Sequence, residues 1–573
     1  MPRTRFRPLV AAALVAAGLV AVVQVEDAVS GSEDAEQLRK IEEAYEYITR
    51  AYVEQVDSAQ LAEDAIEGML AGLDPHSVYV SAEEMRSVRE SFDASFEGIG
   101  IYYEFVEGRA GADTLVVLMP IAGGPSDEAG IQPGDRILQI DGEAAVGYDA
   151  DQVQASLKGP RGTTVDLVVE RPGYRGRLDF TITRDKIPLN TVTAAYMVDD
   201  QTGLVKLQRF ARTSHEEVRD AIAALRAEGM ERLVLDLRGN AGGLLDQAYA
   251  IADELLPDGD MIVYTESRHR QNRRQYRATG GGVYEGAPLI VLVDEYSASA
   301  SEIVAGAVQD HDRGLVVGRR TFGKGLVQQQ FPMSDGSVLQ MTVSRYYTPA
   351  GRLIQTPYYL GEDDEEYGEA KLAIREAVED RLAPRGGFVD ARAFGAEVPD
   401  SLTYRTDSGR LVYGGGGILP DYIVRPDTLS PALRTVIGKN LDNLFARVEL
   451  ERRGEAFRVD WERRGERAFL TGFRLDDATY DRFLSFVDDQ GTPVVAERPA
   501  DGAAEDEEAE DVLVRSEADA ARADVEARVR AFIARRLFGA EAFYPVVGSI
   551  DRTLIEALTL WDNAASLAQA RAR

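Results

Sequence analysis

The chain has 573 residues, and its 97 acidic side chains against 64 basic ones give a formal net charge of −33. Such a charge argues against nucleic-acid binding, because phosphates would be repelled. The sequence contains no cysteine, which excludes disulfides and thiolate-held metal ions, and its four histidines show no metal-ligand spacing. We therefore expect no metal and no other cofactor, and the length predicts several domains.

An export signal is predicted within residues 1–30. Three arginines stand among the first seven residues, and an apolar run from Leu9 to Val23 follows them. A basic leader before such a run is typical of exported proteins. We expect the protein in the periplasm or cell envelope. The signal is either cleaved or retained, and in the second case residues 9–25 anchor the chain in the inner membrane.

Residues 31–95 are predicted to form a helical N-terminal domain, because their apolar residues recur at helical spacing. The pattern breaks at Leu73–Ser77, where His76 follows a proline. A histidine in such a turn is more often a structural hydrogen-bonding group than a catalytic base.

Short alternating strands and glycine turns replace the helical pattern over residues 96–187. A glycine-rich segment leads into one of these strands. Consecutive N–H groups in such a loop can bind a terminal carboxylate, and the strand edge beyond it can accept a peptide. The predicted peptide-binding residues are Gly98, Ile99, Gly100 and Ile101.

Strand and helix patterns alternate over residues 188–357, which predicts an α/β core. A buried strand that ends in a glycine-rich turn exposes backbone N–H groups at the sheet edge, where α/β folds usually place ligands. The expected elements are strands at Gly203–Leu207 and Leu233–Leu237, a helix at Ser214–Glu228 capped by Ser214, the turn Arg238–Gly243, and a helix at Leu244–Leu255.

Candidate catalytic side chains stand in two later segments of this core. A serine cluster, Ser297–Ser301, lies between a predicted strand at Leu289–Val293 and a predicted helix at Glu302–Gln309. A helix N-terminus favours developing negative charge. Downstream, Lys324 stands between two glycines, and it can act as a base only when an apolar setting keeps its amine neutral.

These two segments predict a serine–lysine hydrolase in which Ser299 attacks a carbonyl and Lys324 removes its proton. Two alternatives remain open from the residues alone. In the first, the serines are a helix cap and the lysine lies in a surface turn. In the second, His311 is the base, although its neighbour Asp310 points about 100° away on a helix and cannot easily orient it.

Residues 297–310 and 321–328 closely resemble the core of the carboxyl-terminal processing peptidases, also called tail-specific proteases. The resemblance implies that Ser299 is the nucleophile, that Lys324 is the general base, and that Gln328 orients the lysine. It also gives Asp310 a supporting role. The glycine-rich turn matches the family's oxyanion loop, so the resemblance assigns the oxyanion amides to Ala300 and Gly242, with Gly243 as the near alternative.

A second resemblance covers Pro125–Gly142, which is similar to protease-associated PDZ domains. It implies a PDZ domain over residues 96–187 that captures free C-termini. The family also implies a crotonase-like ββα-spiral for the protease core. The sequence therefore predicts a multidomain α/β protein, with the PDZ domain inserted between a helical N-terminal region and the core.

The family pattern continues through a predicted strand at Val338–Tyr347 and is then interrupted. Residues 358–416 form an insertion that begins with acidic residues and has a predicted helix at Glu369–Arg381, and residues 417–429 end the core. Residues 430–573 are predicted to be helical, with an acidic linker at 503–511. The last helices either pack on the core or mediate homo-oligomerisation.

The resulting prediction is an exported serine endopeptidase that recognises substrate C-termini through its PDZ domain and cleaves the tails through an acyl-enzyme. Its partners are proteins or peptides with free C-termini. The alternative is a peptide-binding or chaperone-like envelope protein that contains a PDZ domain and an inactive protease core.

Overall fold

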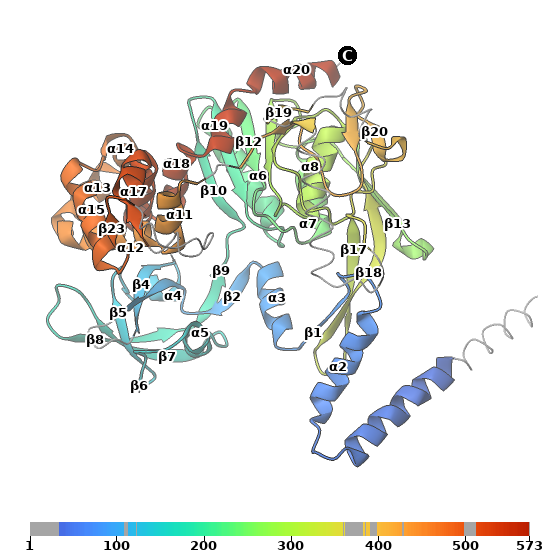
Figure 1. Ribbon diagram of the computed structural model, residues 1–573, viewed down its shortest axis with the longest axis horizontal. Coiled ribbons are helices and arrows are strands. Elements are labelled where there is room, and N and C mark those ends of the chain that lie inside the picture. Colours follow the sequence, from blue (N-terminus) through green and yellow to red (C-terminus); the bar gives the residue numbers. More distant parts are fainter. Residues whose placement is uncertain are drawn as a thin grey trace, which may run out of the picture. The chain divides into compact units, whose positions relative to one another are not determined.

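The computed structural model describes residues 34–107, 113–121, 123–358, 360, 382–383, 386–389, 398–426, 429–497 and 512–571 (Figure 1). The chain divides into two compact units, one containing the residues up to Ser81 with Gln330–Met341, and the other containing nearly everything else. The expected export signal, the expected helix at 369–381 and the acidic linker at 503–511 lie outside the described residues. Within the described ranges, no helix is both long and apolar enough to cross a membrane.

The smaller unit is mainly helical, as predicted. A helix over residues 34–51 is followed by α2 (Ser58–Leu70), whose first turn is capped by the Asp57 side chain. A short strand that was not predicted, β1 (Val78–Val80), pairs antiparallel with the start of β18 (Val338–Tyr347).

The turn that contains His76 is closed by Asp74. The Asp74 carboxylate accepts hydrogen bonds from the His76 N–H at 3.1 Å and from the Ser77 hydroxyl at 2.7 Å. The turn is therefore held by its own side chains.

In the larger unit, α3 (Glu84–Phe92) leads into a sheet with the strand order β3-β4-β5-β7-β8. Strand β3 is an edge strand, and α5 (Ala150–Leu157) begins with a capping box formed by Asp149 and Gln152. The remaining elements of this part are β2 (Ser95–Gly98), β3 (Ile101–Glu107), β4 (Asp113–Pro120), α4 (Pro125–Glu128), β5 (Arg136–Ile140), β6 (Glu143–Ala144), β7 (Thr164–Glu170), β8 (Arg177–Thr183) and β9 (Asp185–Pro188).

The core contains a sheet that, among the described residues, has seven strands in the order β10-β11-β12-β15-β16-β22-β19. The five strands from β11 to β22 run parallel, whereas β10 and β19 pair antiparallel at the two edges. The bounds are β10 (Val192–Met197), β11 (Thr202–Leu207), β12 (Arg232–Asp236), β15 (Leu289–Val293), β16 (Leu315–Gly318), β19 (Gly387–Phe388) and β22 (Tyr422–Ile423).

Alternate residues of each strand point to opposite sides of the sheet. Both faces are buried, because helices pack on each of them. One face, which includes Val205 and Val291, packs against the helices α6 (Ser214–Ala227), α7 (Leu245–Asp253) and α8 (Ala300–Asp310). The other face packs against the end of the chain. There Leu204, Val234, Ile290 and Leu292 contact residues of α19 (Arg552–Leu558) and α20 (Trp561–Arg571).

These contacts bear on the role predicted for the C-terminal helices. The last two helices pack on the core sheet, which was the first of the two roles considered for them. They therefore complete a three-layer arrangement of helices, sheet and helices.

The predicted cap of α6 is wrong. Thr213 occupies the N-cap position, and its side chain makes no capping hydrogen bond. Ser214 is already helical, and its hydroxyl accepts from the Ala211 N–H and donates to the Arg209 carbonyl. The hydroxyl thus closes the turn that precedes the helix.

Further strands and helices complete the larger unit. The described residues between Ala432 and Val547 form a helical cluster with its own apolar core. The elements are β13 (Met261–Glu266), β14 (Arg274–Arg277), β17 (Leu326–Pro332), β20 (Thr403–Arg405), β21 (Leu411–Tyr413), α11 (Pro431–Gly438), α12 (Leu441–Arg453), α13 (Glu455–Arg464), α14 (Glu466–Gly472), α15 (Asp477–Asp489), β23 (Val494–Val495), β24 (Leu513–Val514), α16 (Arg515–Ala520), α17 (Arg522–Phe538) and α18 (Phe543–Gly548).

Candidate active site

Ser299 stands at the turn between β15 and α8, as the sequence predicts, and its backbone is strained. Its φ of 54° and ψ of −107° lie in a region that non-glycine residues rarely occupy. Such a conformation costs about 1–3 kcal/mol and is found mostly at functional sites. The serine is half-buried, so its side chain remains partly accessible to solvent.

Glu302 fixes this turn from inside the protein. Its carboxylate accepts hydrogen bonds from the Ser299 N–H at 2.7 Å and from the Thr321 hydroxyl at 2.6 Å. It also accepts from the backbone N–H groups of Gly323 at 2.7 Å and Lys324 at 2.9 Å. One carboxylate therefore joins the serine turn to the lysine turn, although the two segments are more than twenty residues apart in the sequence.

Burial raises the pKa of Glu302 to about 7. The four hydrogen bonds that its carboxylate accepts lower the pKa and only partly offset the effect of burial. The side chain is fully buried, so the charged form lacks solvent stabilisation. The contacts that join the two turns therefore involve a carboxyl group that gains or loses its proton near neutral pH.

Tyr346 joins the same two turns through their carbonyl groups. Its hydroxyl lies within hydrogen-bond distance of the Ser299 carbonyl oxygen, at 3.1 Å, and of the Lys324 carbonyl oxygen. The tyrosine is buried, and its strand, β18, was predicted over the same residues.

The Lys324 side chain is held by Gln328, four residues further on. The lysine Nζ donates to the Gln328 Oε1 at 2.9 Å, and both side chains are half-buried. Gly323, beside the lysine, has a φ of 89°, and a Cβ there would come within 2.3 Å of the Thr356 hydroxyl oxygen. Only glycine fits this position, so the lysine turn can pack tightly against its neighbours.

The glycine-rich turn lies directly against the serine turn. A Cβ on Gly242 would come within 3.0 Å of both the Ala300 nitrogen and the Ser299 Cβ. The Gly242 N–H donates to the Asn240 Oδ1 at 2.9 Å. In the part of the chain that the structure describes, the N–H groups of Gly243 and Ala300 donate no hydrogen bond.

Asn240 connects this loop to the serine turn through its backbone. Its carbonyl oxygen accepts from the Ala298 N–H at 3.0 Å and from the Ser301 hydroxyl at 2.8 Å. Its side-chain amide donates to the Leu207 carbonyl at the end of β11. The loop is thus tied to two neighbouring strand ends.

Asp310 and His311, at the other end of α8, are fully occupied. Asp310 forms a buried ion pair with Arg352 at 2.5 Å and accepts from the Ala350 N–H. One ring nitrogen of His311 lies 2.7 Å from an Asp407 oxygen, and the other lies 2.7 Å from the Met261 carbonyl. Both nitrogens of the alternative base therefore contact groups other than the serine.

The predicted peptide-binding residues lie where β2 ends and β3 begins. The Ile99 carbonyl accepts from the Ser126 N–H, and the Gly100 carbonyl accepts from the Ile121 N–H. Gly98 ends β2, and Ile101 begins the edge strand β3.

No role for Glu302, Tyr346 or Asn240 was predicted from the sequence. A signal existed for Glu302, because a serine followed three residues later by glutamate is the pattern of a capping box. No local pattern marks Tyr346, whose contacts depend on the long-range position of β18.

Three segments of the chain match known protein families. Residues 201–360 match the model of peptidase family S41, residues 16–84 match the N-terminal domain of the activating protease CtpB, and residues 116–171 match a PDZ domain. The chain is 36% identical over 350 residues to a carboxy-terminal-processing protease of Bartonella bacilliformis, covering 60% of this chain and 79% of that protein.

Two further relatives carry similar names. The carboxy-terminal processing protease CtpB of Bacillus subtilis is 36% identical over 327 residues, covering 56% of this chain and 66% of that protein. A solved structure of the photosystem II D1 C-terminal processing protease is 33% identical with a TM-score of 0.31, covering 55% of this chain and 89% of that one.

The fold and these matches define a serine-type peptidase core that carries a PDZ domain and helical regions. The chain belongs to the family of carboxy-terminal processing proteases, peptidase family S41.

Proposed function

We propose that Ser299 is the nucleophile and that Lys324 is its general base, oriented by Gln328. The main support is the Glu302 carboxylate, which accepts hydrogen bonds from the backbones of both the serine and the lysine. This contact places the two turns side by side and leaves both functional side chains half-buried.

In this mechanism, Ser299 Oγ attacks the peptide carbonyl while Lys324 Nζ takes the hydroxyl proton. The same amine then returns the proton to the leaving amine, and water hydrolyses the resulting acyl-enzyme. The lysine must be neutral to start the cycle, so the rate rises with pH. Its hydrogen bond to Gln328 keeps the amine in one orientation.

For the oxyanion we assign the backbone amides of Ala300 and Gly243. Gly243 is preferred to Gly242 because the Gly242 amide already donates to the Asn240 side chain, whereas Gly243 is exposed. Ala300 is the first residue of α8, where the helix leaves backbone N–H groups without internal partners. Two fixed donors of this kind stabilise a tetrahedral intermediate strongly.

Asp310 has a structural role in this proposal. Its buried pairing with Arg352 holds the end of α8, whose first residues form the serine turn. His311 is not the base, because both of its ring nitrogens have other partners.

We further propose that the PDZ domain binds the free C-terminus of a substrate at Gly98–Ile101. The N–H groups of Ile99 and Gly100 donate no hydrogen bond to any described residue, and β3 beside them is a sheet edge. The amides suit a terminal carboxylate, and the edge suits an added peptide strand. The enzyme would then hold a tail by its end and cleave within it.

The decisive experiment uses an unstructured protein whose C-terminus is either free or amidated. The parent enzyme is expected to cleave the free-tailed substrate faster, and Ser299→Ala is expected to abolish cleavage of both. Cleavage that survives Ser299→Ala would overturn the mechanism. Equal rates for the free and amidated tails would overturn the role of the PDZ domain but not the mechanism.

Three finer points of the prediction remain proposals. We propose that the core is a crotonase-like spiral. We also propose that the protein is located in the periplasm or envelope, with residues 9–25 as signal or anchor. Finally, we propose that the chain forms homo-oligomers through its C-terminal region. Cell fractionation of the full chain and of a chain lacking residues 1–30 tests the location. Light scattering tests the assembly.

A further inference from the structure

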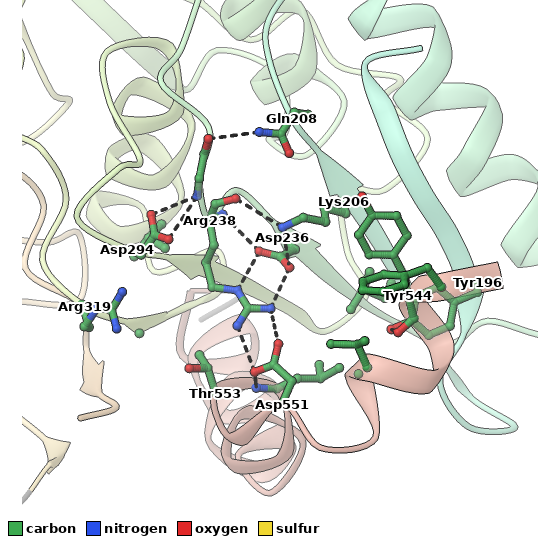
Figure 2. Close-up of a pocket in the computed structure, with 18 residues that line it drawn as sticks. Tyr196, Lys206, Gln208, Asp236, Arg238, Asp294, Arg319, Tyr544, Asp551 and Thr553 are labelled. Carbon is green, nitrogen blue, oxygen red and sulfur yellow. Dashed lines mark hydrogen bonds and ion pairs between the residues drawn. The ribbon is translucent and has the colours of Figure 1, made fainter. Parts of the chain in front are cut away.

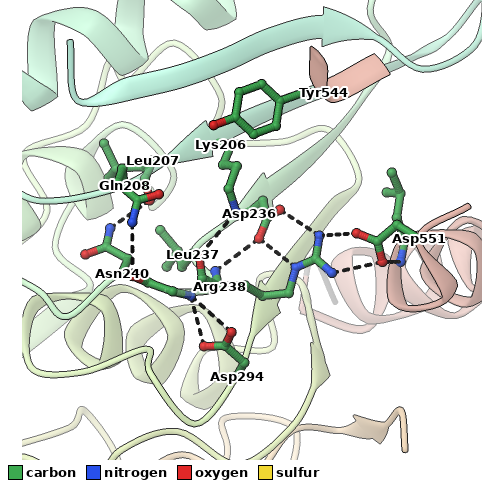
Figure 3. Close-up of polar contacts among 12 residues, drawn as sticks. Lys206, Leu207, Gln208, Asp236, Leu237, Arg238, Asn240, Asp294, Tyr544 and Asp551 are labelled. Atoms are coloured by element: carbon green, nitrogen blue, oxygen red, sulfur yellow. Dashed lines mark hydrogen bonds and ion pairs between the residues drawn. The ribbon is translucent and has the colours of Figure 1, made fainter. Parts of the chain in front are cut away.

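Arg238, the first residue of the glycine-rich turn, is held between two carboxylates. Its guanidinium pairs with Asp236 at 2.8 Å and with Asp551 at 2.7 Å. A second hydrogen bond, from Arg238 Nη1 to the other Asp551 oxygen at 2.9 Å, makes the contact with Asp551 bidentate (Figure 3). Asp551 lies 313 residues away in the sequence.

The contact is largely shielded from water. The Arg238 side chain is 19% exposed and the Asp551 side chain 22%, while Asp236 is almost fully buried. Lys206 adds a second cation, because its amine contacts Asp236 and donates to the Arg238 carbonyl. A bidentate pair between arginine and carboxylate fixes orientation as well as distance.

The turn that begins at Arg238 ends at Gly243, the glycine assigned to the oxyanion. Between them, the Gly239 N–H donates to the Asp294 carboxylate, and Asn240 contacts the serine turn. The loop between Arg238 and the site is short and hydrogen-bonded. We therefore expect a shift of Arg238 to shift the Gly243 amide as well. A misplacement of about 1 Å at a reacting group can lower the rate about a hundredfold.

A cavity lies beside the Arg238 end of this loop. Asp236, Arg238 and Asp551 line a cavity of about 450 Å³, together with Tyr196 and Tyr544 (Figure 2). At its other end the loop is bridged to Phe210, so it is the Arg238 end, beside the cavity, that depends on polar contacts such as the one to Asp551.

Asp551 comes from outside the protease segment. It is the N-cap of α19, where its side chain accepts from the Leu554 N–H, and α19 packs on the core sheet. The matched peptidase segment ends at residue 360. The end of the chain thus supplies a contact to a loop of the core.

We propose that Asp551 is a positioning residue for peptide hydrolysis. By holding Arg238, it fixes the loop that presents the Gly243 amide to the oxyanion, so that the docked C-terminal helix is required for full activity. This inference rests on the proposed serine mechanism.

The test is Asp551→Asn in the full chain. Asparagine has nearly the same shape and is also a good N-cap, so α19 is expected to remain folded while the charge on Arg238 loses one partner. We expect kcat to fall about tenfold with KM for a tail peptide unchanged, because the Gly243 amide acts on a charge that develops only in the transition state. We also expect faster hydrogen–deuterium exchange across residues 238–244.

Asp562→Asn is the matched control. Asp562 lies on α20, is exposed, and makes no ion pair with any residue that the structure describes. This variant is expected to keep the kcat and the exchange rates of the parent. Asp551→Glu, which keeps a carboxylate, is expected to give a kcat between those of the parent and Asp551→Asn, and it serves as the test if the asparagine variant does not fold.

The outcomes separate the two proposals. If Ser299→Ala is inactive but Asp551→Asn keeps the kcat and loop exchange of the parent, the inference is overturned and the mechanism stands. A loss in Asp551→Asn that appears as a higher KM also overturns it. If Ser299→Ala remains active, the mechanism fails, and the exchange measurement still decides whether Asp551 holds the loop.

Discussion

The two ends of helix α8 differ in backbone strain and in the partners of their ionisable side chains. At its start, Ser299 has a strained backbone and Glu302 is a buried carboxyl group with a pKa of about 7. At its end, Asp310 is paired with Arg352, and both ring nitrogens of His311 are occupied. The first end is strained and accessible, whereas the second is closed by its own contacts.

This difference shows that the contacts of a side chain, and not its type alone, distinguish between candidate catalytic residues on one helix. Asp310 and His311 are acid–base groups by type, and their proximity in sequence invites a catalytic interpretation. In the proposed mechanism, their contacts with Arg352, Asp407 and the Met261 carbonyl give them a structural role. The variants below test whether the two ends of α8 have separate roles.

Lys324→Met is expected to have the largest effect. It keeps the length of the side chain but removes the base, so kcat should fall about a thousandfold or more. Kinetics on an unstructured substrate measure this loss. The control is Lys40→Met on the exposed helix over residues 34–51, which should leave kcat unchanged, and an active Lys324→Met enzyme would remove the dyad.

Glu302→Gln is expected to lower kcat about a hundredfold, because an amide cannot accept all four hydrogen bonds that now join the serine and lysine turns. The measurement is kcat together with the exchange rates of the two turns. A variant with parental kcat would show that the carboxylate does not position the site.

The same variant has a signature in the pH dependence of stability. Because the pKa of Glu302 is raised to about 7 in the folded protein, its contribution to stability is greatest below about pH 4.5 and is lost as the pH rises to 7. That loss is on the order of 3 kcal/mol. Thermal melting of the parent should show this decline relative to Glu302→Gln, and parallel curves would contradict it.

Asp310→Asn is expected to act on stability rather than on chemistry. It leaves the buried Arg352 charge without its anion, which should cost about 3–5 kcal/mol. The melting temperature should fall clearly, while kcat per folded enzyme, measured well below the melting range, stays within about threefold of the parent. A selective loss of kcat without destabilisation would give Asp310 a direct catalytic role.

His311→Asn is expected to have the smallest effect. An asparagine can replace part of the contact with Asp407, so we expect stability to fall by about 1–2 kcal/mol and kcat to stay within about twofold. The comparison with Lys324→Met decides between the two bases that the sequence left open. A loss as large as that of Lys324→Met would reverse the assignment.

Much of the scaffold could be predicted from local patterns. The strand at Leu289–Val293 has the predicted bounds, because it is a continuous apolar run before a clear turn signal. The strand at Val338–Tyr347, which the family resemblance implied, also has the predicted bounds. The cap of α6 was mispredicted, since Thr213 and Ser214 are both suitable cap residues and tertiary contacts decide between them.

The contacts that hold the site were harder to foresee. Tyr346 contacts the serine turn from β18, Asn240 contacts it from the loop after β12, and Asp551 contacts Arg238 from the N-cap of α19. No spacing rule links residues so far apart. Even the proposed preference for Gly243 over Gly242 rests on one backbone N–H, that of Gly242, which donates to the Asn240 side chain.

The central claim is tested most directly by locating the covalent intermediate. The full-length enzyme is mixed with an activated peptide ester, quenched in acid and digested, and the acylated residue is identified by mass spectrometry. We predict a single acyl group on Ser299 in the parent and none in Lys324→Met. An acyl group on another residue, or equal acylation of Ser299 without the lysine, would contradict the account.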